Sequence, residues 1–316
     1  MLSIEDSIFM IIITGALIVG LLGNGFIGLV TCIDWVKKKK LTSIDYIFTS
    51  LAFSRISVIC ILEVDMILQI FYPDVSFASK IRVVNNLFWV LGNHSSSWFG
   101  TCLSVFYLLK IANFSHPLFL WLKWRIDRLT VPLLLLCCII SLLTFLALVM
   151  IVNSDDQLHI TEEHNITELL YVSEFRQLTI FNIFGFMVIV PFAMSLISLF
   201  LLILSLWRHT KQVKHNAAGS RDPSTEAHVR AMTTVTSFVF LLFVYYLSYF
   251  LMASSYIVRE KKLAVLFGET IAILYPTGHS LILLLGSNKL RQTSARMLMR
   301  VKTACMMQNL NFANRL

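Results

Sequence analysis

The stretch LTVPLLLLCCIISLLTFLALVMIV, from Leu129 to Val152, contains no acidic or basic side chain and decides the class of fold. An α-helix rises about 1.5 Å per residue, so a run of this length crosses the roughly 30 Å hydrocarbon layer of a bilayer. Inside hydrocarbon every backbone N–H and C=O must be hydrogen-bonded within the segment, and a continuous apolar run achieves this as a helix. The sequence therefore predicts a transmembrane helix here.

Six further runs have a similar length and composition. They extend from about Ile8 to Ile33, Ile44 to Ile70, Val83 to Ile111, Leu178 to Leu206, Ala231 to Val258 and Leu263 to Leu285. The chain is 57% hydrophobic and 14% charged, which is too apolar for one soluble core of 316 residues. The alternating ten-residue strands of a membrane barrel are absent from the sequence. We therefore expect an all-α membrane protein, with one seven-transmembrane helix bundle over residues 1–316.

Lysine and arginine are distributed unevenly over the gaps between these runs. Every second gap, together with the tail 286–316, contains 19 of them, and the other gaps contain six. Short cytoplasmic loops carry the excess of basic residues in membrane proteins. The sequence thus predicts an amino terminus outside the cell and a cytosolic carboxyl terminus. The net charge of +8 then follows from topology, and no soluble basic domain remains to bind nucleic acid.

The longest outer gap, residues 153–177, is the predicted second extracellular loop. It contains the sequon Asn165-Ile166-Thr167, so Asn165 is the expected glycosylation site. None of the six cysteines lies in an outer gap, and no disulfide bond is expected to tie an outer loop.

Arg55 is the clearest ionisable residue within a predicted span. It lies roughly 16 Å from the inner end of its helix, too deep to reach water easily, and is expected to face the bundle interior. Asn24 of the first helix is its expected hydrogen-bond partner. Two interpretations stay open: the pair locks helices together, or it takes part in switching between states.

Pro191 and Pro276 interrupt the fifth and seventh helices, and they act there either as hinges or as static bends.

Polar and aromatic residues gather toward the outer ends of the predicted helices. Asp65 and Glu269 could remain ionised in a water-filled cavity, where they would prefer cationic ligands. Trp89 and Asn93 are four residues apart and share one helical face, and an aromatic ring beside an amide is a common pocket lining. His94 is either a hydrogen-bonded core histidine or a ligand contact.

Catalytic and metal-binding patterns are missing from the sequence, which has no GxSxG, Walker A or HExxH motif. We therefore predict no enzyme activity, no cofactor and no metal site. A transporter or channel remains an alternative, because intramembrane charges and broken helices also occur there. Seven segments show no hydropathy repeat and no paired broken helices in two halves, which disfavours that alternative.

Five runs of sequence together resemble the type 2 taste receptors, the bitter receptor family. They are Leu51 to Arg55 (LAFSR), Phe106 to Pro117 (FYLLKIANFSHP), Ser205 to Thr210 (SLWRHT), Arg221 to Met232 (RDPSTEAHVRAM) and Tyr275 to Arg291.

The Asp-Arg-Tyr and NPxxY motifs of rhodopsin-like receptors are absent from this sequence. His279 and Ser280 stand where NPxxY would be, and we group them with Arg55 as structural or switch residues. The Arg221 to Met232 run argues against the alternative of a pheromone receptor.

The resemblance implies a plasma-membrane receptor that binds bitter small molecules and activates a heterotrimeric G protein of the gustducin type. Carried over by position, Trp89, Asn93 and Glu269 match pocket residues of the family. Tyr245 matches an aromatic residue at the floor of that pocket.

The mechanism expected from this resemblance is a population shift. An agonist that prefers the active arrangement biases the sixth helix outward and opens a basic inner cleft. The wall of this cleft is expected to include Lys110, His209, Lys211, Lys214 and His228. The alternative is that these residues only enforce topology and meet lipid headgroups.

Two cytosolic elements are predicted beyond the membrane spans. Asp222-Pro223 is a good N-cap followed by proline at the first helical position, so the sixth helix should begin several residues before the membrane. The tail after Ser287 repeats apolar residues on one face, which predicts a helix lying on anionic membrane lipid.

Overall fold

The structure is a computed structural model of the chain. It describes residues 4–38, 40–72, 76–159, 166–216, 223–255, 261–287 and 289–296, together with Met299, Thr303, Met306 and Met307. Seven long helices make up most of this part: α1 (Ile4–Lys38), α2 (Ser43–Phe71), α3 (Ser76–Ile111), α4 (Pro117–His159), α5 (Ile166–Asn216), α6 (Pro223–Ser255) and α7 (Lys261–Gly286). Residues 289–296 of the tail are also helical. No strand occurs among the described residues. The predicted all-α, seven-helix bundle is confirmed.

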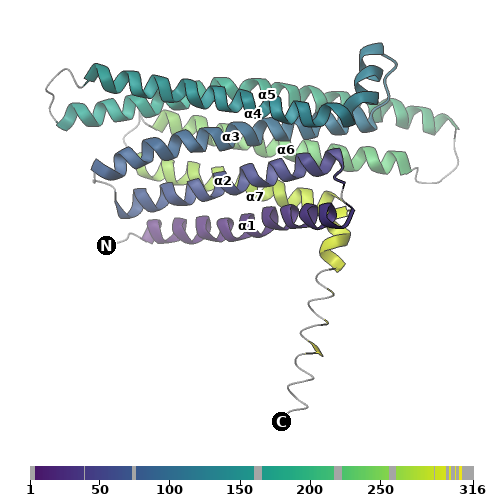
Figure 1. Cartoon of the computed structure of the whole chain (residues 1–316), viewed down its shortest axis with the longest axis horizontal. Coiled ribbons are helices and arrows are strands. Elements are labelled where there is room, and N and C mark those ends of the chain that lie inside the picture. Colours follow the sequence, from purple (N-terminus) through teal and green to yellow (C-terminus); the bar gives the residue numbers. More distant parts are fainter. Residues whose placement is uncertain are drawn as a thin grey trace, which may run out of the picture.

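The helices lie side by side and alternate in direction (Figure 1). Helices α1, α3, α5 and α7 therefore finish at the same end of the bundle, where the tail leaves. We call this the tail end and the opposite end the amino-terminal end. Helix α3 packs against α2, α4, α5 and α6, and α7 packs against α1, α2 and α6. Residues on α3 and α7 are thus placed to contact most of the other helices.

Five of the described helices are long and apolar enough to cross a membrane. The candidate spans are Ser7–Lys37, Pro117–Ile151, Met187–His209, His228–Ser248 and Leu266–Gly286. Helices α2 and α3 also contain polar side chains that are buried: Arg55 is 0% exposed, and Asn93 and His94 are each 1% exposed. Together with Asn24 of α1 and with His279 and Ser280 of α7, they form a polar interior.

The helices extend beyond the predicted spans. Helix α4 continues to His159 and α5 begins at Ile166, so residues 153–159 and 166–177 of the predicted outer loop are helical. An apolar run marks the hydrocarbon layer, whereas a helix continues wherever its own backbone hydrogen bonds persist. Helix α6 begins at Pro223, as predicted from its cap. Asn165 and residues 256–258 lie outside the described part of the chain.

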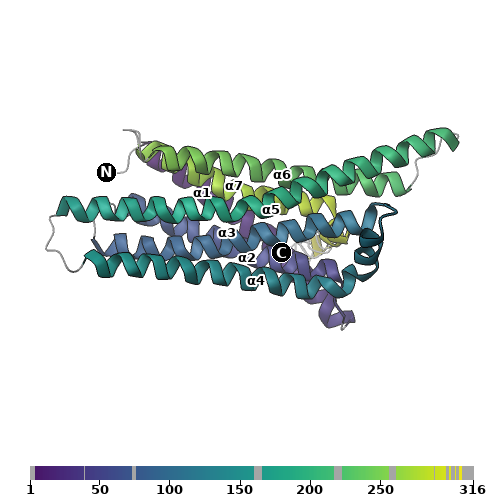
Figure 2. The same ribbon diagram turned by 90° about the horizontal axis from the view of Figure 1, so that it is seen from above.

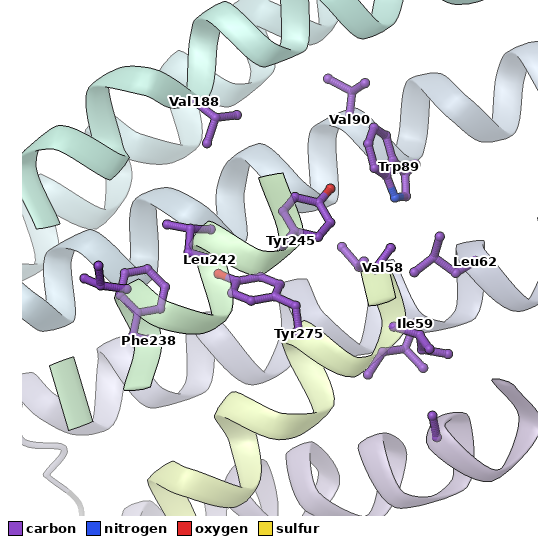
Figure 3. Close-up of a cluster of buried hydrophobic side chains, with 14 of the residues drawn as sticks. Val58, Ile59, Leu62, Trp89, Val90, Val188, Phe238, Leu242, Tyr245 and Tyr275 are labelled. Atoms are coloured by element: carbon purple, nitrogen blue, oxygen red, sulfur yellow. The ribbon is translucent and has the colours of Figure 1, made fainter. Parts of the chain in front are cut away.

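The largest buried apolar cluster lies where α2, α3, α6 and α7 meet. Figure 3 shows Trp89 from α3, Tyr245 and Phe238 from α6, and Tyr275 from α7 converging on this region. Val58, Ile59 and Leu62 approach it from α2. This cluster places large aromatic rings in the middle of the bundle, which is the setting of the candidate site.

Candidate ligand-binding and signalling sites

Arg55 lies at the centre of a hydrogen-bonded network that joins three helices. Its Nη1 donates to Ser280 Oγ of α7 at 3.1 Å, and its Nη2 donates to His279 Nδ1. The Ser280 hydroxyl is within 2.7 Å of both Asn24 Oδ1 of α1 and the Pro276 carbonyl. The expected direct bond between Arg55 and Asn24 is therefore replaced by a bridge through Ser280. The residue that joins them is 225 positions from Arg55 in the sequence, so spacing could not reveal it.

The hydrogen bonds that the structure gives to Arg55 all go to neutral groups. Because an arginine can only donate, His279 Nδ1 is the acceptor and the ring proton is on Nε2. Arg55 Nε and His279 Nε2 are buried without a hydrogen-bond partner in the described chain. A buried cation held by neutral acceptors costs free energy to desolvate. A small rearrangement of the acceptors around Arg55 would therefore change the free energy of the buried network substantially.

A column of rings runs from Tyr245 toward Arg55. The Tyr245 and Tyr275 rings are 5.2 Å apart, the Tyr275 and Phe238 rings are 6.4 Å apart, and the Phe238 and His279 rings are 4.9 Å apart between centroids. Aromatic pairs at these separations attract each other beyond their buried area. Helix α6 thus contacts, through Phe238, the same histidine that Arg55 contacts from α2.

Helix α6 also approaches α3 very closely at Gly100. A Cβ atom built on Gly100 would lie 2.5 Å from two atoms of the Phe238 ring. Only a glycine fits at this contact without a shift of the Phe238 ring or of one helix. A glycine inside an apolar helix was the available sequence signal for such a contact, but the sequence does not show which residue it faces.

The predicted ligand residues occupy the half of the bundle nearer the amino-terminal end. Trp89 and Tyr245 are buried and belong to the same apolar cluster (Figure 3). Asn93 is 1% exposed, and its Nδ2 is buried without a hydrogen-bond partner in the described residues. Glu269 is also buried, at 5% exposure. Asp65 lies at the α2–α3 contact, where its Oδ1 accepts a long bond of 3.5 Å from Asn85 Nδ2.

His94 lies at the contact between α3 and α4. Trp98 Nε1 donates to His94 Nε2 at 3.1 Å, so Nδ1 carries the ring proton and donates to Ser141 Oγ of α4 at 3.0 Å. Both ring nitrogens are engaged within the protein. This arrangement favours the interpretation of His94 as a hydrogen-bonded core histidine over that of a ligand contact.

The two prolines considered as hinges, Pro191 and Pro276, differ in their surroundings. Thr101 Oγ1 of α3 and Ser195 Oγ both donate to the Pro191 carbonyl, at 2.9 and 2.8 Å. Side-chain hydroxyls commonly compensate backbone groups near a proline in membrane helices. Pro191 therefore links α5 to α3, and Pro276 belongs to the Arg55 network through Ser280.

The predicted signalling residues lie at the tail end, and those whose side chains the structure describes make specific contacts there. Lys110 Nζ forms an ion pair with Asp127 Oδ2 of α4 at 2.6 Å. The stacked rings of His209 and His228 join α5 to α6, and His228 Nε2 is 3.4 Å from Ser205 Oγ. Lys211 Nζ lies over the Trp207 ring, 5.7 Å from its centroid. The side chain of Lys214 lies outside the described part of the chain.

A second ion-pair cluster at the tail end was missed from the sequence. Lys289 Nζ, just after α7, lies 2.5 Å from Asp34 Oδ2 of α1 and 2.5 Å from Asp45 Oδ1 of α2. Burial alone lowers the pKa of Lys289, but the hydrogen bonds to Asp34 and Asp45 outweigh that effect, so its pKa lies above the ordinary value. The contribution of Lys289 to stability is therefore present at physiological pH and is lost as the pH rises through that raised pKa. Burial alone raises the pKa of the Asp45 carboxyl, but its hydrogen bonds to Lys289 and Thr42 outweigh that effect and lower the pKa, so the contribution of Asp45 is lost as the pH falls through it.

We predict that Lys289→Met lowers the free energy of unfolding by about 1 to 3 kcal/mol, because it leaves the buried Asp45 carboxylate without its charged partner. Thermal unfolding of the purified protein measures this loss. Lys110→Met is the matched control, since its pair with Asp127 is 41% and 59% exposed. Exposed pairs contribute about 0 to 1 kcal/mol. Equal losses in the two variants would show that the Lys289 cluster has no special role in stability.

Seven alternating helices around a polar and aromatic interior are the plan of a G-protein-coupled receptor, and the comparisons with known proteins identify the family. A family model described as Taste receptor protein (TAS2R) matches residues 1–302. The chain therefore belongs to the type 2 taste receptors, the bitter taste receptor family, which is not a family of enzymes. The resemblance found in the sequence is confirmed.

Individual relatives support the same assignment. The chain is 53% identical to human taste receptor type 2 member 8 over 311 residues, which are 97% of this chain and 100% of that receptor. It is 54% identical to the gorilla receptor of the same name over 310 residues, 96% of this chain and 99% of that one. It is also 48% identical to taste receptor type 2 member 7 of Papio hamadryas over 289 residues, 91% of each chain.

Proposed function

We propose that this chain is a plasma-membrane receptor for bitter small molecules that signals through a gustducin-type heterotrimeric G protein. Its amino terminus lies outside the cell and its tail in the cytosol. The proposal rests on membership of the family together with the arrangement of the buried residues near the amino-terminal end.

The observation that carries the ligand site is the buried amide of Asn93. A buried donor without a hydrogen-bond partner costs about 1 to 3 kcal/mol, a cost that a bound ligand or water removes. Asn93 is one helical turn from Trp89, which shares an apolar cluster with Tyr245 of α6. A ligand placed here gains apolar contact from the rings and one oriented hydrogen bond from the amide. Such a site tolerates many shapes at modest affinity.

Glu269 adds a preference for cationic ligands. A carboxylate in a dry surrounding attracts a protonated amine, and an aromatic ring nearby adds a cation–π contribution. We predict that Glu269→Gln weakens the response to cationic agonists about tenfold, because a charge-assisted hydrogen bond becomes a neutral one. Responses to neutral agonists should change little.

Dose–response curves for calcium release, with cationic and neutral agonists on the same cells, measure this difference. The neutral agonists are the internal control, because they cannot form the charge-assisted bond, and Asp65→Asn tests the other predicted acid in the same way. An equal loss for both kinds of agonist in Glu269→Gln would show that Glu269 has a structural role only.

The contacts at the tail end support coupling to a G protein. Helix α6 is held to α5 through the stacked rings of His209 and His228, and to the end of α3 through Ser205, whose Oγ lies 3.3 Å from Asn113 N. An outward movement of α6 would exchange these contacts. It would open a cleft beside the exposed Lys110 and Lys211 of the neighbouring helices.

The decisive experiment combines two measurements on the purified protein in lipid discs and in liposomes. A receptor should accelerate nucleotide exchange on a purified G protein when a bitter agonist is added, and should carry no solute across the liposome membrane. Solute flux without nucleotide exchange would support a transporter and reject the proposal. A carboxyl-terminal tag that antibody reaches on intact cells would reject the orientation.

A further inference from the structure

The six tryptophans divide into two groups. Trp89 and Trp98 lie within the bundle, whereas Trp35, Trp121, Trp124 and Trp207 are 59%, 48%, 85% and 63% exposed. All four exposed tryptophans lie toward the tail end, on α1, α4 and α5. Tryptophan is enriched at the level of lipid headgroups, because its ring is apolar and its N–H requires a polar partner. These four rings therefore mark the level at which the bundle leaves the hydrocarbon.

Two of these tryptophans sit on α4 beside unpaired arginines. The Arg125 guanidinium lies over the Trp121 ring, 4.8 Å from its centroid. Arg125 and Arg128 are exposed, and neither forms an ion pair with a carboxylate in the described part of the chain. The nearby Asp127 is already bonded to Lys110 Nζ and Ser43 Oγ. The two guanidinium groups thus keep their charge available to an external anion.

The opposite side of this segment is fixed to the protein. Lys123 Nζ donates to the Ala112 carbonyl and to Asn113 Oδ1, at 2.7 and 2.6 Å. Phe119 packs edge-on against Phe114, with centroids 5.1 Å apart. These contacts cap the end of α3 and hold the segment in one orientation, so its outer face is rigid. Figures 1 and 2 show that the first turns of α4 turn away from the long axis of the bundle.

The outer face of these first turns adjoins the lipid-facing side of α4. Trp121, Arg125 and Arg128 follow one another at helical spacing before the bend, and the exposed Leu135, Ile139 and Leu142 follow after it. A surface that adjoins the hydrocarbon-facing side of a helix faces lipid, and not the interior cleft that a G protein would enter. Arginines with an open guanidinium edge favour phosphate oxygens, which they bind in pairs.

We propose that Trp121, Trp124, Arg125 and Arg128 form a binding site for the phosphate headgroup of an anionic phospholipid of the cytoplasmic leaflet. The proposal rests on the orientation given under the proposed function, in which the tail end is cytosolic. The arginines bind the headgroup phosphate, and the indole rings pack against the glycerol and the first methylene groups. The site positions α4, and through Lys123 the end of α3, relative to the membrane surface.

The test counts the lipids that the purified receptor retains. The protein is placed in discs of phosphatidylcholine containing phosphatidylserine, released gently, and weighed by native mass spectrometry. Arg125→Gln/Arg128→Gln should reduce retained phosphatidylserine at least about fivefold, since each basic residue near a headgroup contributes roughly that factor. Arg208→Gln/Lys211→Gln is the matched control, with the same loss of charge at the same end of the bundle on α5, and it should retain phosphatidylserine.

Two outcomes would overturn the proposal: unchanged phosphatidylserine in the α4 variant, or equal loss in both variants. Unchanged phosphatidylserine together with a loss of nucleotide exchange would identify a G-protein surface instead. Arg125→Lys/Arg128→Lys keeps the charge and the fold, so an intermediate loss in this variant separates binding from misfolding. The lipid count requires neither agonist nor G protein, and it can therefore fail while the proposed receptor function stands.

Discussion

Arg55→Ala is expected to lower the free energy of unfolding by about 3 to 5 kcal/mol. Arg55 is one of the largest fully buried side chains, so the variant leaves a cavity and also removes the donors that satisfy His279 Nδ1 and Ser280 Oγ. A loss of this size is a large part of the total stability of a typical domain, about 5 to 15 kcal/mol. Thermal unfolding of the purified receptor and the amount at the cell surface measure it.

Arg55→Met separates the two interpretations of this residue. Methionine fills much of the same volume without charge, so it should recover most of the stability lost in the alanine variant. If Arg55 takes part in switching, agonist responses remain low in Arg55→Met although the protein reaches the surface. If agonist responses return together with stability, Arg55 serves only to hold α1, α2 and α7 together.

Gly100→Ala is the second change with a large expected effect. The new Cβ would lie 2.5 Å from Phe238 Cε2 and Cζ, so α6 must move away from α3 or the ring must leave its position. Overpacking of this kind costs about 1 to 3 kcal/mol. Because the strain is relieved when α6 moves outward, we expect agonist-independent G-protein activation to rise. Nucleotide exchange on a purified G protein without agonist measures it.

A second substitution tests the cause of that rise. Phe238→Leu in the Gly100→Ala background removes the ring atoms that clash and should return basal exchange toward its original level. Gly28→Ala is the matched control, because a Cβ atom there meets nothing within 4 Å. An alanine in a helix is otherwise slightly favoured over glycine. High basal exchange in the Gly28 variant would mean that the contact with Phe238 is not responsible.

The class of fold could be predicted because the bilayer imposes length and composition on each span. The runs on α1 and α4 to α7 are apolar enough to be recognised without a structure. Helix ends were less predictable, as α4 shows by starting at Pro117, twelve residues before the predicted span. The backbone of a helix continues into the headgroup region, where its residues are no longer required to be apolar.

Candidate site residues could be chosen from their chemistry, but their partners could not. Arg55 and Asn24 were recognised as polar residues at membrane depth, while Ser280 between them depends on how α7 packs. His94 was ambiguous because Ser141, its partner on α4, has no signal in the sequence. The Gly100 contact with Phe238 likewise depends on the crossing of two helices, which periodicity within either helix does not contain.

The neutral surroundings of Arg55 limit how deep a charged agonist can travel. Glu269 is ten residues from His279 along α7, so the carboxylate lies about 15 Å further out by helical rise. At that separation an uncompensated cation still repels another by roughly 1 kcal/mol at an effective dielectric constant of about 20, and the repulsion grows with every step inward. Protonated amines should therefore stop near Glu269, and only uncharged compounds can penetrate as far as Tyr275.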